Sequence, residues 1–294
     1  MLEKFQDPPN QKKFGISKII RELYKIPNWI PLDADIQHGW TAHDTIFQIA
    51  NKNRLQLVWS KRVADILFSK GFKRYYQIPN QFISFTKSKF TRSNYSKGTL
   101  FFPQHTDEGW EAKYDLDILI NVLKKLPEDC KPITICLYYY DYLNDKIKSR
   151  FERNFKVVTA GDISNPKFIE KFFNMMIDYD YCASDTIGTY TFYSVYMDIP
   201  FFLIDNHWGH ISKESNQEGM NRDDYLKEFP EYKKAHDLFS VESPYIITDK
   251  QKEYVYKEMG LNNSNTFRRI QFELLLSGIK MLIKLQFKKI LQKT

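Results

Sequence analysis

Cysteine is scarce in this sequence, and long apolar runs are missing. The three cysteines, Cys130, Cys136 and Cys182, are too few and too scattered for a disulfide framework or a zinc site. No stretch of about 18 uncharged apolar residues occurs, so no segment is expected to cross a bilayer. Residues 1–13 are polar and lack the apolar stretch of a signal peptide. These absences predict an intracellular protein.

Glycine-rich nucleotide-binding motifs are also missing. The sequence contains no G-x-G-x-x-G pattern, no Walker loop and no internal repeat, which excludes the best-marked dinucleotide and nucleotide-triphosphate folds. The Asp115-x-Asp117 pair falls at the start of an expected helix, where acidic side chains favour the helix dipole. His207 and His210 have no cysteine or acidic partner at a familiar metal-ligand spacing. We therefore expect no bound metal and no cofactor.

Positive charge is concentrated at the end of the chain. The net charge is +7, and residues 266–294 hold seven basic side chains against the single acid Glu273. The rest of the chain is close to neutral, which argues against a nucleic-acid partner. The same terminal segment has apolar residues at helical spacing, with Lys280, Lys284 and Lys288 one turn apart. It predicts a C-terminal amphipathic helix with a cationic face.

Two interpretations of this helix stay open. Basic residues near an anionic membrane surface contribute on the order of 1 kcal/mol each, so the helix can hold the protein at the inner face of the cell membrane. Alternatively, the helix packs back across the N-terminal domain and its lysines are solvated. Both interpretations can hold for different faces of the helix. The expected location is the cytoplasm, including its membrane surface.

The N-terminal part alternates between helical and strand-like spacing. The predicted helices span 16–25, 41–50 and 61–70, the last with Gly71 as its C-cap. The predicted strands span 29–32, 55–59, 75–78 and 82–85. The polar segment 86–98 is typical of a linker. These patterns predict a separate N-terminal α/β domain over residues 1–95.

A more regular alternation follows. The predicted strands span 99–102, 133–138, 155–159, 181–183 and 199–204. The predicted helices span 116–126, 145–153, 166–177, a segment ending near Met197, 222–239 and 249–259. Strands that alternate with helices of this length predict an α/β fold with a parallel sheet and right-handed crossovers. We expect this second domain over residues 96–265, with the helix over 266–294 after it.

Three polar loops follow predicted strands and are expected at one rim of the sheets. The first spans 36–43 and contains His38, the second spans 102–109, and the third spans 184–189. A loop histidine can accept a proton as general base, or pair with phosphate when charged. In the third loop, small hydroxyl side chains precede a helix whose free N–H groups make an anion site. The simpler interpretations are N-capping by Ser184 or Thr186 and histidines without catalytic duty.

These loops resemble motifs of GT-B glycosyl- and glycerophosphotransferases of bacterial surface polysaccharides. His38-Gly39 resembles the His-Gly pair that is implicated as base in polymerases of teichoic-acid type. The third loop, with Ser184-Asp185-Thr186 and Gly188-Thr189, resembles the Thr/Ser-Asp-x-x-Ser-type loop that holds the donor phosphates there. The segment 196–201 resembles the helix-to-strand exit that follows that loop. Pro103-Gln104-His105 occupies the place of the His-Pro motif of CMP-sugar-dependent sialyl- and Kdo-type transferases.

This resemblance implies two Rossmann-like domains that face each other across a cleft. It implies an inverting, metal-independent glycosyltransferase that moves a sugar from a nucleotide-sugar donor to a glycan or lipid-linked acceptor, in capsule or lipopolysaccharide assembly. His38 is the implied catalytic base. The implied donor-binding residues are His105, Thr106, Gly161, Ser184, Asp185, Thr186, Gly188 and Thr189.

Two further functions stay open beside the glycosyltransferase. The same loops would serve a phosphotransferase that moves a polyol phosphate from a CDP donor. A non-enzymatic scaffold at the membrane surface would bind no nucleotide at all. The response to a panel of nucleotides separates these three functions, because a ligand at 100 times its dissociation constant stabilises a protein by about 2.7 kcal/mol.

Overall fold

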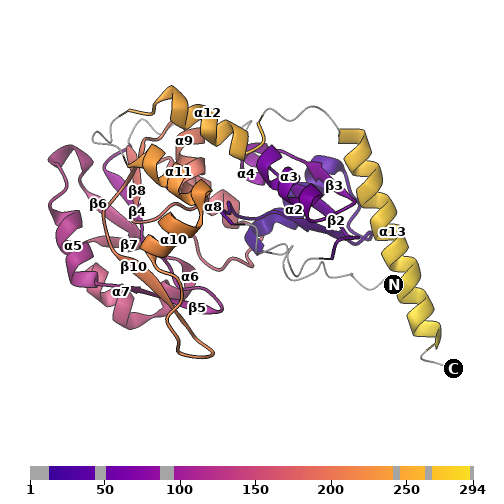
Figure 1. The fold of residues 1–294 in the computed structure, drawn as a ribbon, viewed down its shortest axis with the longest axis horizontal. Coiled ribbons are helices and arrows are strands. Elements are labelled where there is room, and N and C mark those ends of the chain that lie inside the picture. The colour runs from indigo at the N-terminus through magenta and orange to yellow at the C-terminus, as the bar shows by residue number, and fades with distance from the viewer. Residues whose placement is uncertain (1–12, 44–50, 87–95, 241–245, 262–266, 292–294) are drawn as a thin grey trace.

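The computed structural model describes residues 13–43, 51–86, 96–240, 246–261 and 267–291, with side chains as far as residue 287. The chain forms two separate parallel sheets and one antiparallel ribbon, so the α/β class predicted from the alternation is confirmed. Figure 1 shows the N-terminal sheet and the larger sheet side by side. The helix expected over 41–50 and the linker expected over 86–98 lie largely outside the described residues.

The N-terminal lobe is built on a three-stranded parallel sheet in the order β1-β2-β3. Its elements are η1 (Lys13–Gly15), α2 (Ile16–Tyr24), β1 (Ala34–Ile36), β2 (Leu55–Val58), α3 (Lys61–Ser69), β3 (Tyr75–Gln77) and α4 (Gln81–Thr86). The central strand β2 is buried along its whole length, as an apolar run with a neighbour on each side requires. Ser60 starts α3 because its Oγ accepts the N–H of Val63 at 3.3 Å. Gly71 follows α3 with a φ of 78°, as expected for a C-terminal glycine.

Two predicted strands of this lobe are wrong. Residues 82–85 lie in helix α4, where the side-chain oxygen of Asn80 accepts a backbone N–H two residues later at 2.7 Å and starts a helical turn. Residues 29–32 include a turn in which the N–H of Ile30 donates to the carbonyl of Pro27 at 3.1 Å. In both places the apolar run is largely buried without being a strand, an ambiguity that short apolar runs always carry.

The C-terminal lobe is built on a five-stranded parallel sheet in the order β7-β6-β4-β8-β9. Its strands are β4 (Thr99–Phe102), β6 (Ile133–Cys136), β7 (Lys156–Val158), β8 (Tyr181–Ser184) and β9 (Phe201–Leu203). The helices and turns between them are α5 (Leu116–Lys124), η3 (Glu128–Cys130), α6 (Tyr139–Leu143), α7 (Asp145–Glu152), α8 (Phe168–Met176) and α9 (Thr189–Tyr196). All five strands predicted for this lobe are confirmed. The chain enters at the central strand β4, runs outward through β6 and β7, and then returns to β8 and β9, so a topological switch point lies between β4 and β8.

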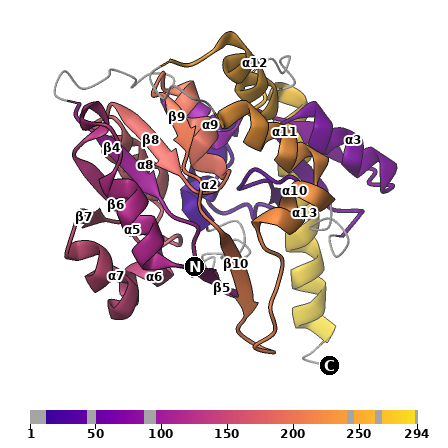
Figure 2. The ribbon, with the colours of Figure 1, turned by 60° about the vertical axis from the view of Figure 1, so that its left-hand side comes forward.

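An antiparallel ribbon and three helices complete this lobe. The ribbon pairs β5 (Trp110–Tyr114) with β10 (Trp208–Ser212), and neither strand is predicted by the sequence pattern. The helices are α10 (Arg222–Glu228), α11 (Pro230–Phe239) and α12 (Asp249–Glu258). The single helix expected over 222–239 is divided at Pro230, which lacks an N–H and therefore begins a new helix. Figure 2 shows the ribbon beside α10, below the five-stranded sheet.

The two lobes share an apolar core. Phe82 of α4 stacks on Tyr193 of α9, with ring centroids 4.0 Å apart, and α4 also contacts α8. The expected cleft between the lobes stays a prediction. Helix α13 (Phe267–Leu291) packs back onto α2 and β2 of the N-terminal lobe, as one of the two interpretations expects. Within the described residues, none of the helices combines the length and apolar character needed to span a bilayer.

Candidate functional site

The loops after β4 and β8 meet at the switch point of the five-stranded sheet. The hydroxyl of Ser184 donates to the carbonyl of Phe102 at 2.6 Å. The backbone N–H of Gln104 donates to Oδ1 of Asp185 at 2.7 Å. The structure therefore brings the second and third polar loops together at the carboxyl edge of the sheet, where open α/β sheets bind ligands.

A buried carboxylate holds the third loop in place. Asp185 is 2% exposed. Its Oδ2 accepts the side-chain amide of Asn206 at 2.8 Å, and its backbone carbonyl accepts the indole N–H of Trp208 at 2.9 Å. Burial raises the pKa of Asp185 to about 6, even though the hydrogen bonds from Asn206 and Gln104 act in the opposite direction. These contacts anchor the loop, and the predicted donor-binding role of Asp185 remains a prediction.

The two hydroxyl side chains of the loop are also turned into the protein. Ser184 lies within 2.9 Å of the hydroxyl of Tyr190, and Thr186 lies within 2.9 Å of the hydroxyl of Tyr232. Both are buried. Neither caps α9: the N-cap is Gly188, where a Cβ would lie 2.6 Å from the Tyr190 ring. The capping interpretation is therefore wrong, and the predicted donor-binding role of these hydroxyls remains a prediction.

The start of α9 faces the first polar loop. The backbone N–H of Trp40 donates to Oγ1 of Thr189 at 2.9 Å, and a Cβ on Gly39 would lie 3.5 Å from the same oxygen. In the part of the chain that the structure describes, the N–H groups of Thr189 and Tyr190 donate no hydrogen bond. These N–H groups remain available to an anion at the positive end of the helix dipole.

His38 lies in this first loop, next to the turn η1. Its ring stacks on Phe14 with centroids 5.8 Å apart, and Phe14 in turn contacts Phe168 of the C-terminal lobe at 5.0 Å. The residue keeps solvent access on one side. Desolvation on the other sides and the Lys13 ammonium lower the pKa of His38, while a hydrogen bond to the backbone of Ile36 raises it. A lowered pKa keeps the imidazole neutral at pH 7, the form that accepts a proton.

His105 and Gly161 line a small pocket at the same edge of the sheet. The pocket has a volume of about 50 Å³. The other lining residues are Phe102, Pro103, Cys136, Leu137, Tyr138, Thr159, Ala160, Phe168, Phe172 and Tyr190. The His105 ring stacks on Tyr138 at 4.3 Å and forms one wall. A water molecule occupies about 30 Å³ in the liquid, so the pocket as it stands admits only a small group.

Thr106, next to His105, bonds the loop after β4 to the neighbouring elements. Its N–H donates to Oδ2 of Asp141 at 2.9 Å, and its hydroxyl accepts the N–H of Ala112 in β5 at 3.2 Å. Thr106 and Asp141 are both buried, and burial raises the pKa of Asp141. Thr106 therefore joins the loop to the ribbon, and its predicted donor-binding role remains a prediction.

A larger hollow lies on the other side of Gln104. Its volume is about 580 Å³, and His207, His210 and Arg222 are among its lining residues. The Gln104 amide lies 2.5 Å from Nε2 of His210, so one side chain separates the hollow from the switch-point loops. Among the described residues, no group of three histidine, cysteine, aspartate or glutamate side chains could hold a metal ion. The prediction of a metal-independent reaction remains untested.

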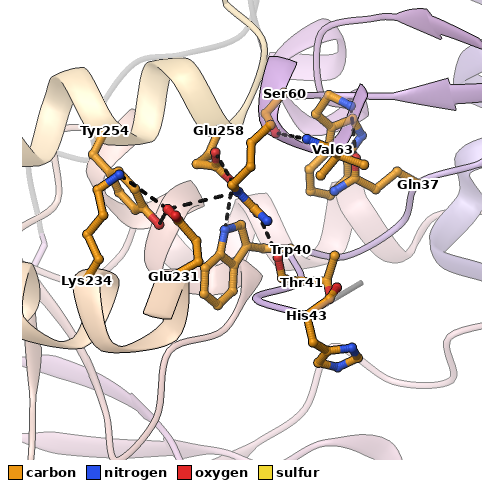
Figure 3. A network of polar contacts seen from close by, with 12 residues as sticks. Gln37, Trp40, Thr41, His43, Ser60, Val63, Glu231, Lys234, Tyr254 and Glu258 are labelled. Carbon is orange, nitrogen blue, oxygen red and sulfur yellow. Dashed lines mark hydrogen bonds and ion pairs between the residues drawn. The ribbon is translucent and has the colours of Figure 1, made fainter. Parts of the chain in front are cut away.

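A polar clasp joins the two lobes at Trp40 and Thr41 of the first polar loop (Figure 3). Arg62 of α3 binds Glu258 of α12 at 2.6 Å and lies 4.0 Å from Glu231. The same guanidinium donates to the carbonyl of Thr41 at 2.7 Å, and the indole N–H of Trp40 donates to Glu258 at 3.0 Å. The clasp thus fixes the loop that carries His38. Sequence reasoning missed the clasp. The available signal was that Glu258 follows the aromatic Tyr254 by four residues, which places both side chains on the same face of the helix.

Comparisons with known proteins find distant structural likenesses only. No family model matches, and no curated protein matches. The wall teichoic acid polymerase TagF is 17% identical, with a TM-score of 0.38 over 78% of this chain and 58% of that one. The GtfA/B complex is 11% identical, with a TM-score of 0.32 over 88% of this chain and 52% of that one. The chain spans little more than half the length of these structures, and its membership of a family stays a prediction.

Proposed function

We propose that the protein transfers a sugar from a nucleotide-linked donor to a hydroxyl group of a glycan acceptor. One observation carries the proposal: polar loops that lie far apart in the sequence converge at one place. The N–H of Trp40, beside the His38 loop, reaches Thr189 at the start of α9, and the loop after β4 is bonded to the loop after β8. A candidate base and a candidate phosphate site therefore share the switch-point edge.

The donor would bind with its phosphates at the start of α9. The free N–H groups of Thr189 and Tyr190 carry partial positive charge that favours a bound phosphate, and the His105 ring lines the adjacent pocket. The pocket is smaller than a nucleotide, whereas the hollow of about 580 Å³ beside it falls within the range of about 300–1,000 Å³ typical of ligand sites. The nucleoside would therefore extend past Gln104 toward His207.

The reaction would use His38 as its base. The neutral imidazole takes the proton of the acceptor hydroxyl while its oxygen bonds to the sugar carbon. The bond from that carbon to the donor phosphate breaks with inversion, and the leaving nucleotide takes the electron pair. Positive helix-end charge stabilises the leaving phosphate. The sequence resemblance implies a glycan or lipid-linked acceptor in capsule or lipopolysaccharide assembly.

A nucleotide panel, two histidine variants and one control variant test the proposal. Isothermal titration calorimetry with UDP, GDP, CMP and CDP should show one nucleotide class that binds, and His105→Ala should weaken its binding by about tenfold, which corresponds to about 1.4 kcal/mol. Phe68→Ala, which removes an exposed ring from helix α3, is the control and should bind normally. His38→Ala should bind the nucleotide and lose turnover. Failure of every nucleotide to bind would favour the scaffold, and a response to CDP alone would favour the polyol phosphotransferase.

A further inference from the structure

Helix α13 has apolar side chains on two opposite faces. The inner face contains Ile270 and Leu274, which are at most 2% exposed and pack on the N-terminal lobe. The outer face contains the outer stripe, defined as Phe272, Leu276, Ile279, Ile283 and Phe287. Four of these residues are 42–63% exposed, and Leu276 is half-buried.

The outer stripe is continuous along the helix. Its residues recur at intervals of three and four, which places them on one side of an α-helix. At a rise of about 1.5 Å per residue, the stripe extends over about 22 Å. Figure 1 shows that the C-terminal part of α13 runs along the edge of the molecule and beyond its body. A flat surface can therefore reach the stripe without meeting another element first.

Charge decides which partner fits the stripe. Lys280 and Lys284 flank it on one side, both exposed, and Arg268 lies on the other. The one acid of α13, Glu273, is already paired with Arg74 at 2.6 Å. A second copy of the helix would place lysine against lysine, whereas an anionic surface would neutralise them.

We propose that α13 docks the protein onto an anionic lipid bilayer, with the outer stripe in the headgroup–acyl boundary and the lysines among the lipid phosphates. The helix lies in the plane of the membrane, because its inner face stays packed on the N-terminal lobe. The docking is independent of the proposed transfer reaction. It would hold the N-terminal lobe, and with it His38, at the membrane surface.

Vesicle flotation tests this docking. The full chain should bind phosphatidylglycerol vesicles far more tightly than phosphatidylcholine vesicles, and high salt should weaken the binding. Ile283→Ser with Phe287→Ser should reduce binding about a hundredfold, because each buried side chain contributes about tenfold. Phe68→Ser with Ile246→Ser is the matched control, since both residues are exposed apolar side chains outside α13. This control should bind like the wild type.

A fluorescent label gives a second readout that does not depend on affinity. The three native cysteines are buried, so a Phe287→Cys variant can be labelled with an environment-sensitive dye at one exposed position. Its emission should shift to the blue on addition of phosphatidylglycerol vesicles, and the label on Phe68→Cys should not. Equal binding by the stripe variant, or no blue shift, would overturn the proposal. So would a wild-type dimer that the stripe variant converts to monomers while neither binds vesicles.

Discussion

At the scale of single residues, the buried carboxylate of Asp185 makes the stability of the protein depend on pH. Its folded-state pKa is raised from 3.8 to about 6 by burial, so the folded state holds this proton more tightly than the unfolded chain. The stabilisation by this proton is therefore complete below about pH 4 and is lost as the pH rises through about 6. At neutral pH, the charged carboxylate lowers the stability of the native loop.

Asp185→Asn should remove this dependence. The amide keeps an oxygen for the N–H of Gln104, and the neighbouring amide of Asn206 can turn to match the new donor. Relative to the variant, the wild type should lose about 3 kcal/mol of unfolding free energy between about pH 4 and pH 7. Urea unfolding of both proteins across this range measures the difference. The exposed Asp129→Asn is the control, and a pH-independent difference for Asp185→Asn would show that the carboxylate is already ionised across the range.

The same loop shows how far sequence reasoning reaches at this scale. The composition of 184–189 correctly indicated a polar loop between a strand and a helix, at the edge where ligands bind. It could not show that Ser184 and Thr186 point inward. Their partners, Phe102 and Tyr232, come from β4 and α11, which local spacing cannot bring together. The direction of a side chain depends on such distant neighbours.

At the scale of elements, the packing of α13 on the N-terminal lobe depends on a glycine. A Cβ on Gly278 would lie 2.3 Å from Cγ2 of Ile30 and 2.4 Å from the carbonyl oxygen of Pro31. Alanine favours a helix over glycine by about 1 kcal/mol, but overpacking costs about 1–3 kcal/mol. Because the carbonyl oxygen belongs to the backbone and cannot rotate away, the cost of the steric overlap should exceed the gain in helix propensity.

Gly278→Ala should therefore destabilise the protein by about 1–2 kcal/mol. Chemical denaturation measures this change, and faster amide exchange in α13 would locate it. Gly109→Ala is the matched control, because a Cβ there would meet only one side-chain atom, at 3.9 Å. An increase in stability for Gly278→Ala would mean that the helix propensity outweighs the contact with Pro31.

Periodicity predicted most elements because most of them bury one face locally. It failed where an element is buried on all sides, or where its partner is distant in the sequence. Helix α4 is too short to show a helical period, and its start depends on Asn80. The ribbon strands, β5 and β10, are short and lie far apart in the sequence, with Trp208 opposite Tyr114. The sequence around neither strand predicts which segment it pairs with.

At the scale of the whole molecule, the two lobes are held together by an apolar core and by the clasp of Arg62 and Glu258. Glu258 is 7% exposed in its side chain and Arg62 is 21% exposed, so water screens this pair less than the surface pairs. Both carboxylate oxygens are used: they accept N–H groups of Arg62 and the indole N–H of Trp40. The clasp therefore couples the position of α12 to that of the His38 loop.

Glu258→Gln should loosen the lobes without changing the size of the side chain. Glutamine has one acceptor oxygen for three N–H donors and carries no charge, so Arg62 would keep an opposite charge only in the more distant Glu231. Removing one partner of a fully buried pair costs about 3–5 kcal/mol, and the partial exposure of Arg62 reduces the expected loss to about 2 kcal/mol. Amide hydrogen exchange should become faster in α3 and α12 and stay slow in the central strand β4.

The neighbouring Glu253 provides the matched control for this variant. It lies on the same helix and pairs with Lys257 at 2.7 Å, but both side chains are about two-thirds exposed. Glu253→Gln should therefore leave the stability and the amide exchange of α12 close to those of the wild type. Equal effects of the two variants would mean that the clasp contributes no more than a surface ion pair. The position of the first polar loop against the start of α9 would then depend on the shared apolar core, through contacts such as that of Phe82 with Tyr193.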